Sequence, residues 1–186
     1  MRIIAGSRRG LRLQAPRDER IRPTADFARE ALFDILGHGA PPLAGARVLD
    51  LFAGTGALGF EALSRGATFV LALETERAAL KLLRANAARF GAADAHRVLA
   101  RDATRLGRAD APFDFALLDP PWDGALVMPA LRGLVAGSWL CPGARVVLEQ
   151  ASGTAVPEVE GLMLEQQRRY GAATFIFLRR LPDESV

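Results

Sequence analysis

From residue 47 onward, short apolar runs alternate with stretches of helical period, and this alternation limits the fold more than any other feature. Residues 113–118 form an almost continuous apolar run, as expected of a strand covered on both faces. The alternation predicts a parallel sheet with helices on both faces, the doubly wound α/β class. Ligands of such sheets bind at the carboxyl ends of the strands, so we expect functional residues directly after strands.

The sequence predicts a single domain, residues 1–186, with an N-terminal extension over 1–40 and a core over 41–186. The extension is expected to hold a short β-hairpin within residues 1–22 and a helix capped by Thr24 that ends at Gly37. Core strands are expected at 47–51, 68–73, 96–100, 113–118 and 145–149, and helices at 57–64, 76–90 and 126–136. A hairpin of 162–168 and 173–178 is expected to end the chain.

Basic residues gather near the N-terminus. Residues 1–22 contain seven arginines against two acidic residues, although the whole chain carries a net charge of only +3. Such asymmetry indicates a basic arm that binds a polyanion. If that polyanion is RNA, the candidate RNA-binding residues are Arg8, Arg9, Arg12, Arg22 and Arg29, and the alternative role of Arg22 and Arg29 is to brace the core.

Several other classes of protein are disfavoured. Cys141 is the single cysteine, so no disulfide can form within the chain, and with only His38 and His96 the sequence offers no metal site. The N-terminus lacks the apolar region of a signal peptide, and no apolar run is long enough to span a membrane. We expect a cytoplasmic monomer with no membrane or metal partner.

A glycine-bearing turn follows the first core strand. Asp50 is followed by Leu-Phe-Ala-Gly-Thr-Gly, in which Gly54 and Gly56 permit a tight turn and a close approach to a ligand before a helix N-terminus. Acidic residues follow the next two strands: Glu74 can accept hydrogen bonds from both ribose hydroxyls, and Asp102 can accept one from an adenine amino group. The candidate cofactor-binding residues are Asp50, Phe52, Ala53, Gly54, Thr55, Gly56, Glu74, Asp102 and Ala103.

Two cofactors suit such a site. A dinucleotide carries a pyrophosphate, which a nearby carboxylate such as Asp50 repels. S-adenosylmethionine carries a sulfonium and an ammonium group, which a carboxylate complements. The sequence therefore favours S-adenosylmethionine, with S-adenosylhomocysteine as the product, over a dinucleotide-dependent oxidoreductase.

The fourth strand ends in Asp119-Pro120-Pro121-Trp122, the candidate catalytic loop. Consecutive prolines stiffen the backbone and remove N–H donors, so the loop displays acceptors: the Asp119 carboxylate and the Pro120 carbonyl. Two acceptors can bind both hydrogens of an exocyclic base amine, and Trp122 can stack on the base. This chemistry predicts methylation of a nucleobase amino group.

The loop resembles the (Asp/Asn)-Pro-Pro-(Tyr/Phe/Trp) signature of amino-methyltransferases, and the chain resembles the RsmD family along almost its whole length. The resemblance includes Arg2-Ile-Ile-Ala-Gly, Arg22-Pro-Thr, Arg29-Glu-Ala-Leu-Phe, residues 49–59 and Glu61-Ala-Leu-Ser-Arg-Gly-Ala. It implies the class I S-adenosylmethionine-dependent methyltransferase fold, a Rossmann-like sheet of seven strands with the last antiparallel. It also implies methylation of a guanine N2 amino group in 16S ribosomal RNA, within a 30S subunit or an assembly intermediate. Trp122 departs from the family's usual Phe or Tyr.

Other functions stay open at this point. Adenine N6 or another amine of DNA or RNA suits the same loop chemistry, and a non-catalytic RNA-binding module would use the basic arm alone. Only the family resemblance narrows the base to guanine.

Overall fold

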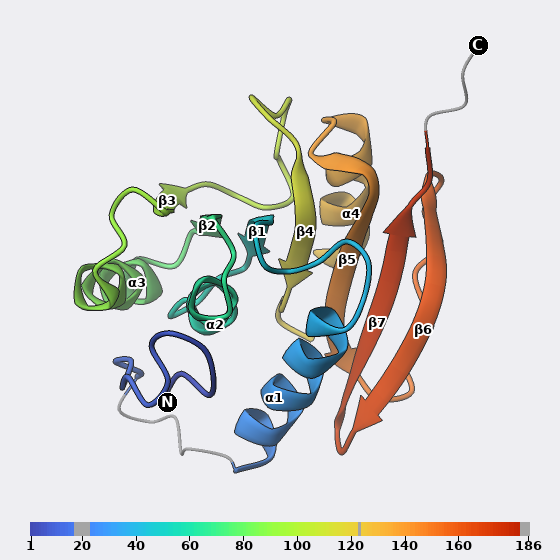
Figure 1. Cartoon of the computed structure of the whole chain (residues 1–186). Coiled ribbons are helices and arrows are strands. Elements are labelled where there is room, and N and C mark those ends of the chain that lie inside the picture. The colour runs from blue at the N-terminus through green and yellow to red at the C-terminus, as the bar shows by residue number, and fades with distance from the viewer. Residues whose placement is uncertain (17–22, 123, 183–186) are drawn as a thin grey trace.

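Apolar strands pair into one seven-stranded sheet of order β3-β2-β1-β4-β5-β7-β6 (Figure 1). The structure, a computed structural model, describes residues 1–16, 23–122 and 124–182, with the side chains of 23–25 left out. Strands β1 to β5 pair with one another in parallel, and β7 is antiparallel to both β5 and β6. The strands are β1 (Arg47–Leu51), β2 (Phe69–Glu74), β3 (His96–Ala100), β4 (Phe113–Leu118), β5 (Leu140–Ala151), β6 (Leu162–Tyr170) and β7 (Ala173–Arg180). The predicted seven-stranded sheet with an antiparallel last strand is confirmed.

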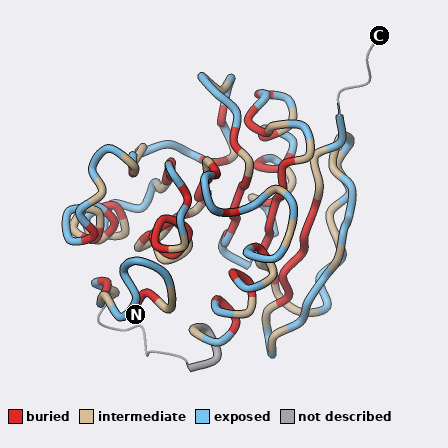
Figure 2. The backbone as a smooth tube through the Cα atoms, viewed as in Figure 1, coloured by how far each residue is buried: buried red, intermediate tan, exposed pale blue. Residues whose placement is uncertain are grey.

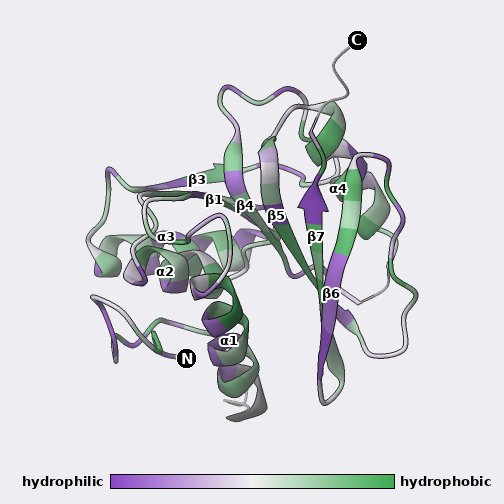
Figure 3. Ribbon diagram, turned by 45° about the vertical axis from the view of Figure 1, so that its right-hand side comes forward, coloured by the Kyte–Doolittle hydropathy of each residue, from purple (hydrophilic) through white to green (hydrophobic). Residues whose placement is uncertain are grey.

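Helices cover both faces of the sheet (Figure 1). They are α1 (Pro23–Gly37), α2 (Ala57–Ser64), α3 (Arg77–Phe90) and α4 (Val127–Ala136). Alternate strand residues point to opposite faces, so Val48 packs with α1, α2 and α3, whereas Leu49 packs with α4. The central strands are buried on both faces, and the edge strand β6 is largely exposed and hydrophilic in its second half (Figures 2 and 3).

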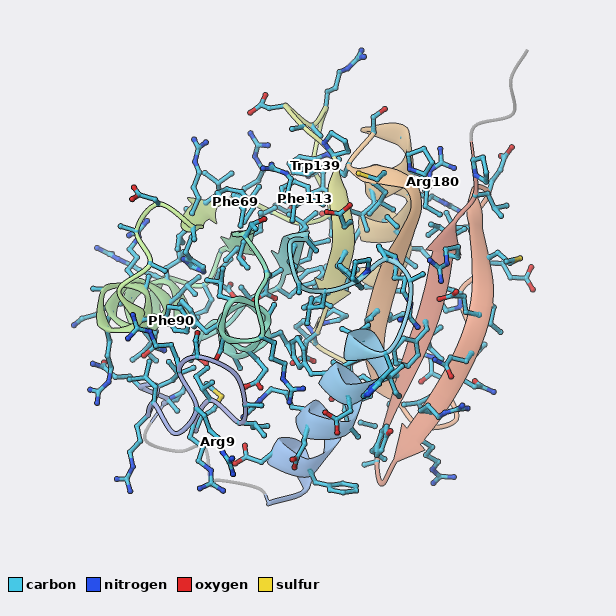
Figure 4. All side chains as sticks on the ribbon, in the orientation of Figure 1. Arg9, Phe69, Phe90, Phe113, Trp139 and Arg180 are labelled. Atoms are coloured by element: carbon cyan, nitrogen blue, oxygen red, sulfur yellow. The ribbon has the colours of Figure 1, made fainter. Side chains whose placement is uncertain are left out.

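An aromatic stack occupies the amino ends of the strands, opposite the expected site. Phe113 lies between Phe69 and Trp139, with ring centroids 6.4 and 6.0 Å away (Figure 4). The Arg47 guanidinium lies 4.8 and 4.9 Å from the Phe69 and Phe113 ring centroids. This end of the sheet is therefore packed with side chains and structural in role.

The N-terminal hairpin expected within residues 1–22 is present in a minimal form in residues 1–16, the N-terminal arm. The arm reverses direction and forms one antiparallel bridge, between Arg2 and Arg12. Ile3 donates to the Leu11 carbonyl and accepts from the Gly10 amide, both at 2.9 Å, and the Leu13 amide donates to the Met1 carbonyl at 3.1 Å. The amides of Ile4 and Ala5 instead donate to the Glu61 carboxylate of α2 at 2.8 and 3.1 Å, so the paired segment stays short.

Helix α1 begins at Pro23, one residue before the predicted cap Thr24, whose side chain lies outside the described set, as does all of Arg22. Proline suits a first helical position because its missing N–H has no intrahelical partner there. Strand β5 also begins earlier than expected, at Leu140, with a register shift against β4 between Phe113 and Phe115.

Glu61 is the anchor of the arm. Its carboxylate is fully buried, and besides the two arm amides it accepts from Arg65 Nε at 2.8 Å. Ser64 adds to the anchor, because its Oγ accepts from the Arg8 amide and donates to the Ala5 carbonyl. A buried carboxylate stabilises the fold only while all of its hydrogen-bond donors are in place, because removing one partner leaves the remaining groups buried and unpaired.

Glu61→Ala is therefore expected to lower the free energy of unfolding by about 2–4 kcal/mol, because two arm amides and Arg65 lose their acceptor. Urea denaturation measures the change. The matched control is Glu160→Ala, which removes an exposed carboxylate and is expected to shift stability by less than about 0.5 kcal/mol. Equal stability of the two variants would contradict the anchoring role.

Candidate functional site

Four carboxylates lie at or near the carboxyl ends of four consecutive strands of the sheet. In spatial order they are Glu74 on β2, Asp50 on β1, Asp119 directly after β4 and Glu149 on β5. We name these four residues the acid row. Adjacent parallel strands lie about 4.8 Å apart, so the acid row concentrates negative charge along one edge of the sheet.

The turn after β1 is built on left-handed backbone. Phe52, Gly54 and Gly56 have φ values of 60°, 54° and 86°. A Cβ at Gly56 would lie 2.4 Å from a Phe60 ring carbon and 2.6 Å from Leu83 Cδ1, so this glycine is needed for packing. A Cβ at Gly54 would meet nothing within 4 Å, so at this point the turn faces open space where a ligand can approach the backbone.

The turn is tied to the strands and to the arm. Ala53 donates its amide to the Leu73 carbonyl at 2.9 Å, and Thr55 accepts from Asn86 Nδ2 at 2.9 Å. Asn86 is fully buried and also exchanges hydrogen bonds with the Gln14 amide and carbonyl, at 2.7 and 3.0 Å. Sequence reasoning missed Asn86, which joins the arm to the glycine turn through one side chain, and no motif around it signals this role.

Glu74 follows the pattern expected of a ribose-binding acid. Its Oε2 accepts from the Gly54 amide at 2.8 Å, and its Oε1 accepts from the amides of Thr75 and Glu76 at 2.6 and 2.8 Å. These bonds fix the carboxylate beside the glycine turn. Each carboxylate oxygen has two lone pairs, so Oε2 keeps one acceptor site for a hydroxyl group of a ligand.

Asp102 lies after β3 and is half exposed. Its Oδ1 accepts from the Thr104 amide at 2.8 Å and from the Thr104 hydroxyl at 2.7 Å, and these bonds hold its pKa below the ordinary value. Arg105 Nε lies 3.9 Å from Oδ2. The neighbouring Ala103 is buried against the second core cluster, so its backbone position is fixed.

Asp50 differs from the other acids because it is only 1% exposed. It accepts one hydrogen bond, from the Gly59 amide at 2.9 Å. Burial raises the pKa of Asp50 to about 7, the Gly59 bond opposes that rise, and the charges of Asp119 and Glu74 add to it. A cationic ligand beside the glycine turn would favour the ionised form of Asp50, which fits the sulfonium and ammonium groups of S-adenosylmethionine.

The candidate catalytic loop borders a cavity of about 230 Å³. Asp119 is exposed, Pro120 is buried, and Trp122 is 50% exposed. The lining is Pro120, Pro121, Trp122, Gly124, Val127, Met128, Glu149, Gln150, Ala151, Thr154, Ala155, Val156 and Pro157. A mostly apolar cavity beside an exposed aromatic ring suits a planar nucleobase.

Sequence reasoning overlooked Glu149, although the residue was expected to end the fifth strand. The register pairs Leu118 with Leu148, so Glu149 on β5 lies at the same level as Asp119, which follows β4. Burial, followed by the charge of Asp119, raises the pKa of Glu149 to about 8. The signal was present in the sequence as an acid at a strand end beside the predicted loop.

The structure separates the candidate RNA-binding arginines. Arg8, Arg9 and Arg12 are exposed on the arm, and the Arg8 guanidinium lies 5.8 Å from the Phe90 ring centroid; Figure 4 shows Arg9 pointing outward. Arg29 is only 7% exposed, and its Nη2 donates to the Arg2 carbonyl at 2.8 Å and to Asp26 at 3.0 Å. In this position Arg29 braces the arm against α1 and does not present its charge at the surface.

Among residues 1–16, 23–122 and 124–182, no group of three or more His, Cys, Asp or Glu side chains is arranged to hold a metal ion. No helix in the described part of the chain is long and apolar enough to cross a membrane.

A comparison with protein-family models matches residues 1–179 to the family described as Conserved hypothetical protein 95. The chain belongs to this family. Ribosomal RNA small subunit methyltransferase D of Escherichia coli is 36% identical over 159 residues, which cover 86% of this chain and 79% of that protein. Putative rRNA methyltransferase YlbH of Bacillus subtilis is 32% identical and covers 92% and 94% of the two chains. The resemblance to the RsmD family is confirmed.

Solved structures agree with the assignment of the fold. A putative methyltransferase, yhhF, from Escherichia coli superposes with a TM-score of 0.86 at 33% identity and covers 98% of this chain and 99% of that one. A putative methylase from Haemophilus influenzae superposes with a TM-score of 0.80 at 30% identity, with 97% and 98% covered. The class I methyltransferase fold of this RsmD-family protein is therefore confirmed.

The buried Asp50 predicts a pH-dependent stability difference. Its folded pKa is raised, so folding holds a proton that the unfolded chain has released, and stability falls as pH rises from about 4 to about 7. Asp50→Asn keeps an oxygen acceptor for Gly59 but cannot ionise. We expect this variant to gain stability relative to the wild type by up to about 1.4 kcal/mol per pH unit in this window.

Urea denaturation of both proteins at several pH values between about 4 and about 8 checks this difference. Parallel pH profiles for the two proteins would contradict it.

Proposed function

We propose that this RsmD-family protein transfers a methyl group from S-adenosylmethionine to the N2 amino group of a guanine in 16S ribosomal RNA. The observation that carries the proposal is the Asp119-Pro120-Pro121-Trp122 loop, which follows β4, the strand beside the glycine turn of β1, and borders an apolar cavity. The names of the relatives, ribosomal RNA small subunit methyltransferase D, support the choice of RNA.

The glycine turn and the acids around it suit S-adenosylmethionine. Glu74 would hold the ribose hydroxyls, Asp102 with Ala103 the adenine, and Asp50 would balance the positive charge of the ligand. The open space at Gly54 admits a ligand close to the backbone. Phe52, Ala53, Thr55 and Gly56 would shape the rest of this site. When bound, the cofactor supplies an electrophilic methyl group on its sulfonium.

The catalytic loop would activate the amine. The lone pair of a guanine amino group is delocalised into the ring, which makes the nitrogen a poor nucleophile. The Asp119 carboxylate and the Pro120 carbonyl would each accept one amine hydrogen and draw the nitrogen towards a tetrahedral geometry. Trp122 would stack on the base, and Pro121 stiffens the loop. The amine gains the methyl group and loses one proton, which leaves to solvent.

The exposed arginines of the arm would contact RNA phosphates. Arg8, Arg9 and Arg12 are exposed on the arm, and Gln14 of the same arm is joined through Asn86 to the glycine turn, so RNA bound along the arm would extend toward the cofactor. The proposal includes a 30S subunit or an assembly intermediate as substrate, a cytoplasmic location and a monomeric enzyme. Arg22 lies outside the described residues, and its contact with RNA stays a prediction.

Asp119→Ala is expected to lower methyl transfer by roughly 100- to 1000-fold, because one of two acceptors for the amine is lost. Asp119→Asn keeps one oxygen acceptor and is expected to retain more activity than the alanine variant. Labelled methyl transfer to 30S particles from a strain that lacks the activity measures both rates. Calorimetry with S-adenosylhomocysteine should give unchanged affinity, since Asp119 acts on the amine.

The same assay, followed by nucleoside mass spectrometry, tests the function itself. N2-methylguanosine in 16S RNA is the expected product. Methylation of naked DNA but not of RNA would overturn the proposal in favour of another amine target such as adenine N6. Full complementation of the strain by Asp119→Ala would instead indicate a non-catalytic RNA-binding role.

Replacing Arg8, Arg9 and Arg12 together by Ala is expected to weaken RNA binding and reduce its salt dependence. Each lost phosphate contact lowers the slope of log affinity against log salt by roughly 0.7–0.9. Arg108 and Arg132 are exposed and lie outside the arm, so their double alanine variant is the matched control. Filter binding over a salt series measures the slope, and an unchanged slope in the triple variant would refute the role of the arm.

A further inference from the structure

Glu149 is the ionisable group among the described residues that line the cavity beside the catalytic loop. The other lining side chains are mostly apolar, such as Val127, Met128 and Val156. The Gln150 amide is already engaged, since it donates to the carbonyls of Thr154 and Ala155 at 3.1 and 3.3 Å. The cavity therefore offers one carboxyl group to whatever enters it.

The Glu149 carboxyl has no hydrogen-bond partner within residues 1–16, 23–122 and 124–182, yet it is partly buried. A partly buried carboxyl has lost part of its hydration, and a ligand group that hydrogen-bonds to it replaces the lost water. Glu149 is among the residues that line the cavity, so a ligand bound there lies next to this residue.

The register sets the distance between Glu149 and the amine site. Leu118 pairs with Leu148, so Asp119 and Glu149 follow at the same level on adjacent parallel strands. Adjacent strands lie about 4.8 Å apart, which is the scale of neighbouring groups on one edge of a purine. A base whose amino group binds Asp119 would place the adjoining ring edge toward Glu149.

We propose that Glu149 is a specificity-determining residue that recognises the Watson–Crick edge of the target guanine, accepting from N1–H and donating to O6. This inference rests on the proposed guanine N2 activity. Asp119 and Pro120 would bind the two N2 hydrogens, one of which lies on the same edge, so the three groups together would match the N2–H, N1–H and O6 of that edge.

Electrostatics supports this division of roles. Burial first, and the Asp119 charge second, raise the pKa of Glu149 to about 8, so near neutral pH its carboxyl keeps a proton. A protonated carboxyl has one donor and one acceptor, as O6 and N1–H require, whereas the amine hydrogens beside Asp119 require acceptors alone. An adenine bound through its amino group would present only N1 in this position and make one hydrogen bond fewer.

The test compares guanine with 2-aminopurine at the methylated position. 2-Aminopurine keeps the amino group but lacks O6 and the N1 hydrogen, so it forfeits one of the two bonds to Glu149. Nucleoside mass spectrometry first locates the guanine that the wild type methylates in 30S particles. Particles are then reconstituted with 16S RNA that carries either base there, and kcat/KM is measured for each.

We expect the wild type to prefer guanine and Glu149→Ala to lose roughly 5- to 150-fold of that preference. The preference is the ratio of kcat/KM on guanine to kcat/KM on 2-aminopurine. Comparing this ratio between variants cancels the intrinsic difference in reactivity of the two amines. Glu149→Gln carries one donor and one acceptor like the protonated acid, and it is expected to restore most of the preference. Glu149→Leu fills a similar volume and replaces the alanine variant if that variant does not fold.

Other results would overturn the inference. An equal loss on both bases in Glu149→Ala would show a structural role, and a Gln variant as unselective as Ala would exclude base recognition by hydrogen bonds. Glu160→Ala, on an exposed residue, is the control and should keep the wild-type preference. If the wild type makes no N2-methylguanosine at all, the proposed function fails first, which distinguishes the two failures.

Discussion

Burial, together with repulsion among neighbouring carboxylates of the acid row, is the constraint on which the arrangement of this protein's site depends. The backbone fixes the spacing of these acids, because the parallel strands that carry them are neighbours in the sheet and end at the same edge. In spatial order the strands are β2, β1, β4 and β5, and the acids are Glu74, Asp50, Asp119 and Glu149. The surroundings of these acids differ. Glu74 accepts from three backbone amides, whereas Asp50 and Glu149 have raised pKa values of about 7 and about 8. Environment thus gives one residue type several protonation states.

The N-terminal arm is part of the same construction. Its backbone bonds to the buried Glu61 and Ser64 of α2, and it continues to Asn86, which also holds Thr55 of the glycine turn. Gly6 packs so closely on α2 that a Cβ there would lie 1.8 Å from the Ser64 carbonyl oxygen. An arm fixed in this way has a defined position relative to the turn, so its exposed arginines form a surface of fixed geometry.

Local signals made much of the fold predictable, and long-range contacts set the limit. Strands β1, β3 and β4 and helix α2 have the predicted bounds, since glycine turns and caps mark their ends. The predicted N-terminal hairpin is short because the amides of Ile4 and Ala5 pair with Glu61, 57 and 56 positions away along the chain. Burial likewise directs Arg29 to Asp26 and the arm, which no sequence pattern distinguishes from a phosphate contact. Glu149 was visible in the sequence as an acid at the end of the fifth strand, and the register shows that it lies beside Asp119.

The distribution of charge also suits the proposal that two different ligands bind at neighbouring places, the cofactor at the glycine turn after β1 and the base in the cavity beside β4 and β5. Around β1, Glu74 and the buried Asp50 favour a cation, since a positive ligand offsets the burial that chiefly raises the pKa of Asp50 and the neighbouring charges that add to that rise. Around β5, the cavity is apolar and its carboxyl tends to be neutral, which favours an uncharged planar base. Asp119 lies between the two regions. In the proposed reaction the amine nitrogen would gain positive charge beside the Asp119 carboxylate, which would stabilise that charge where it develops.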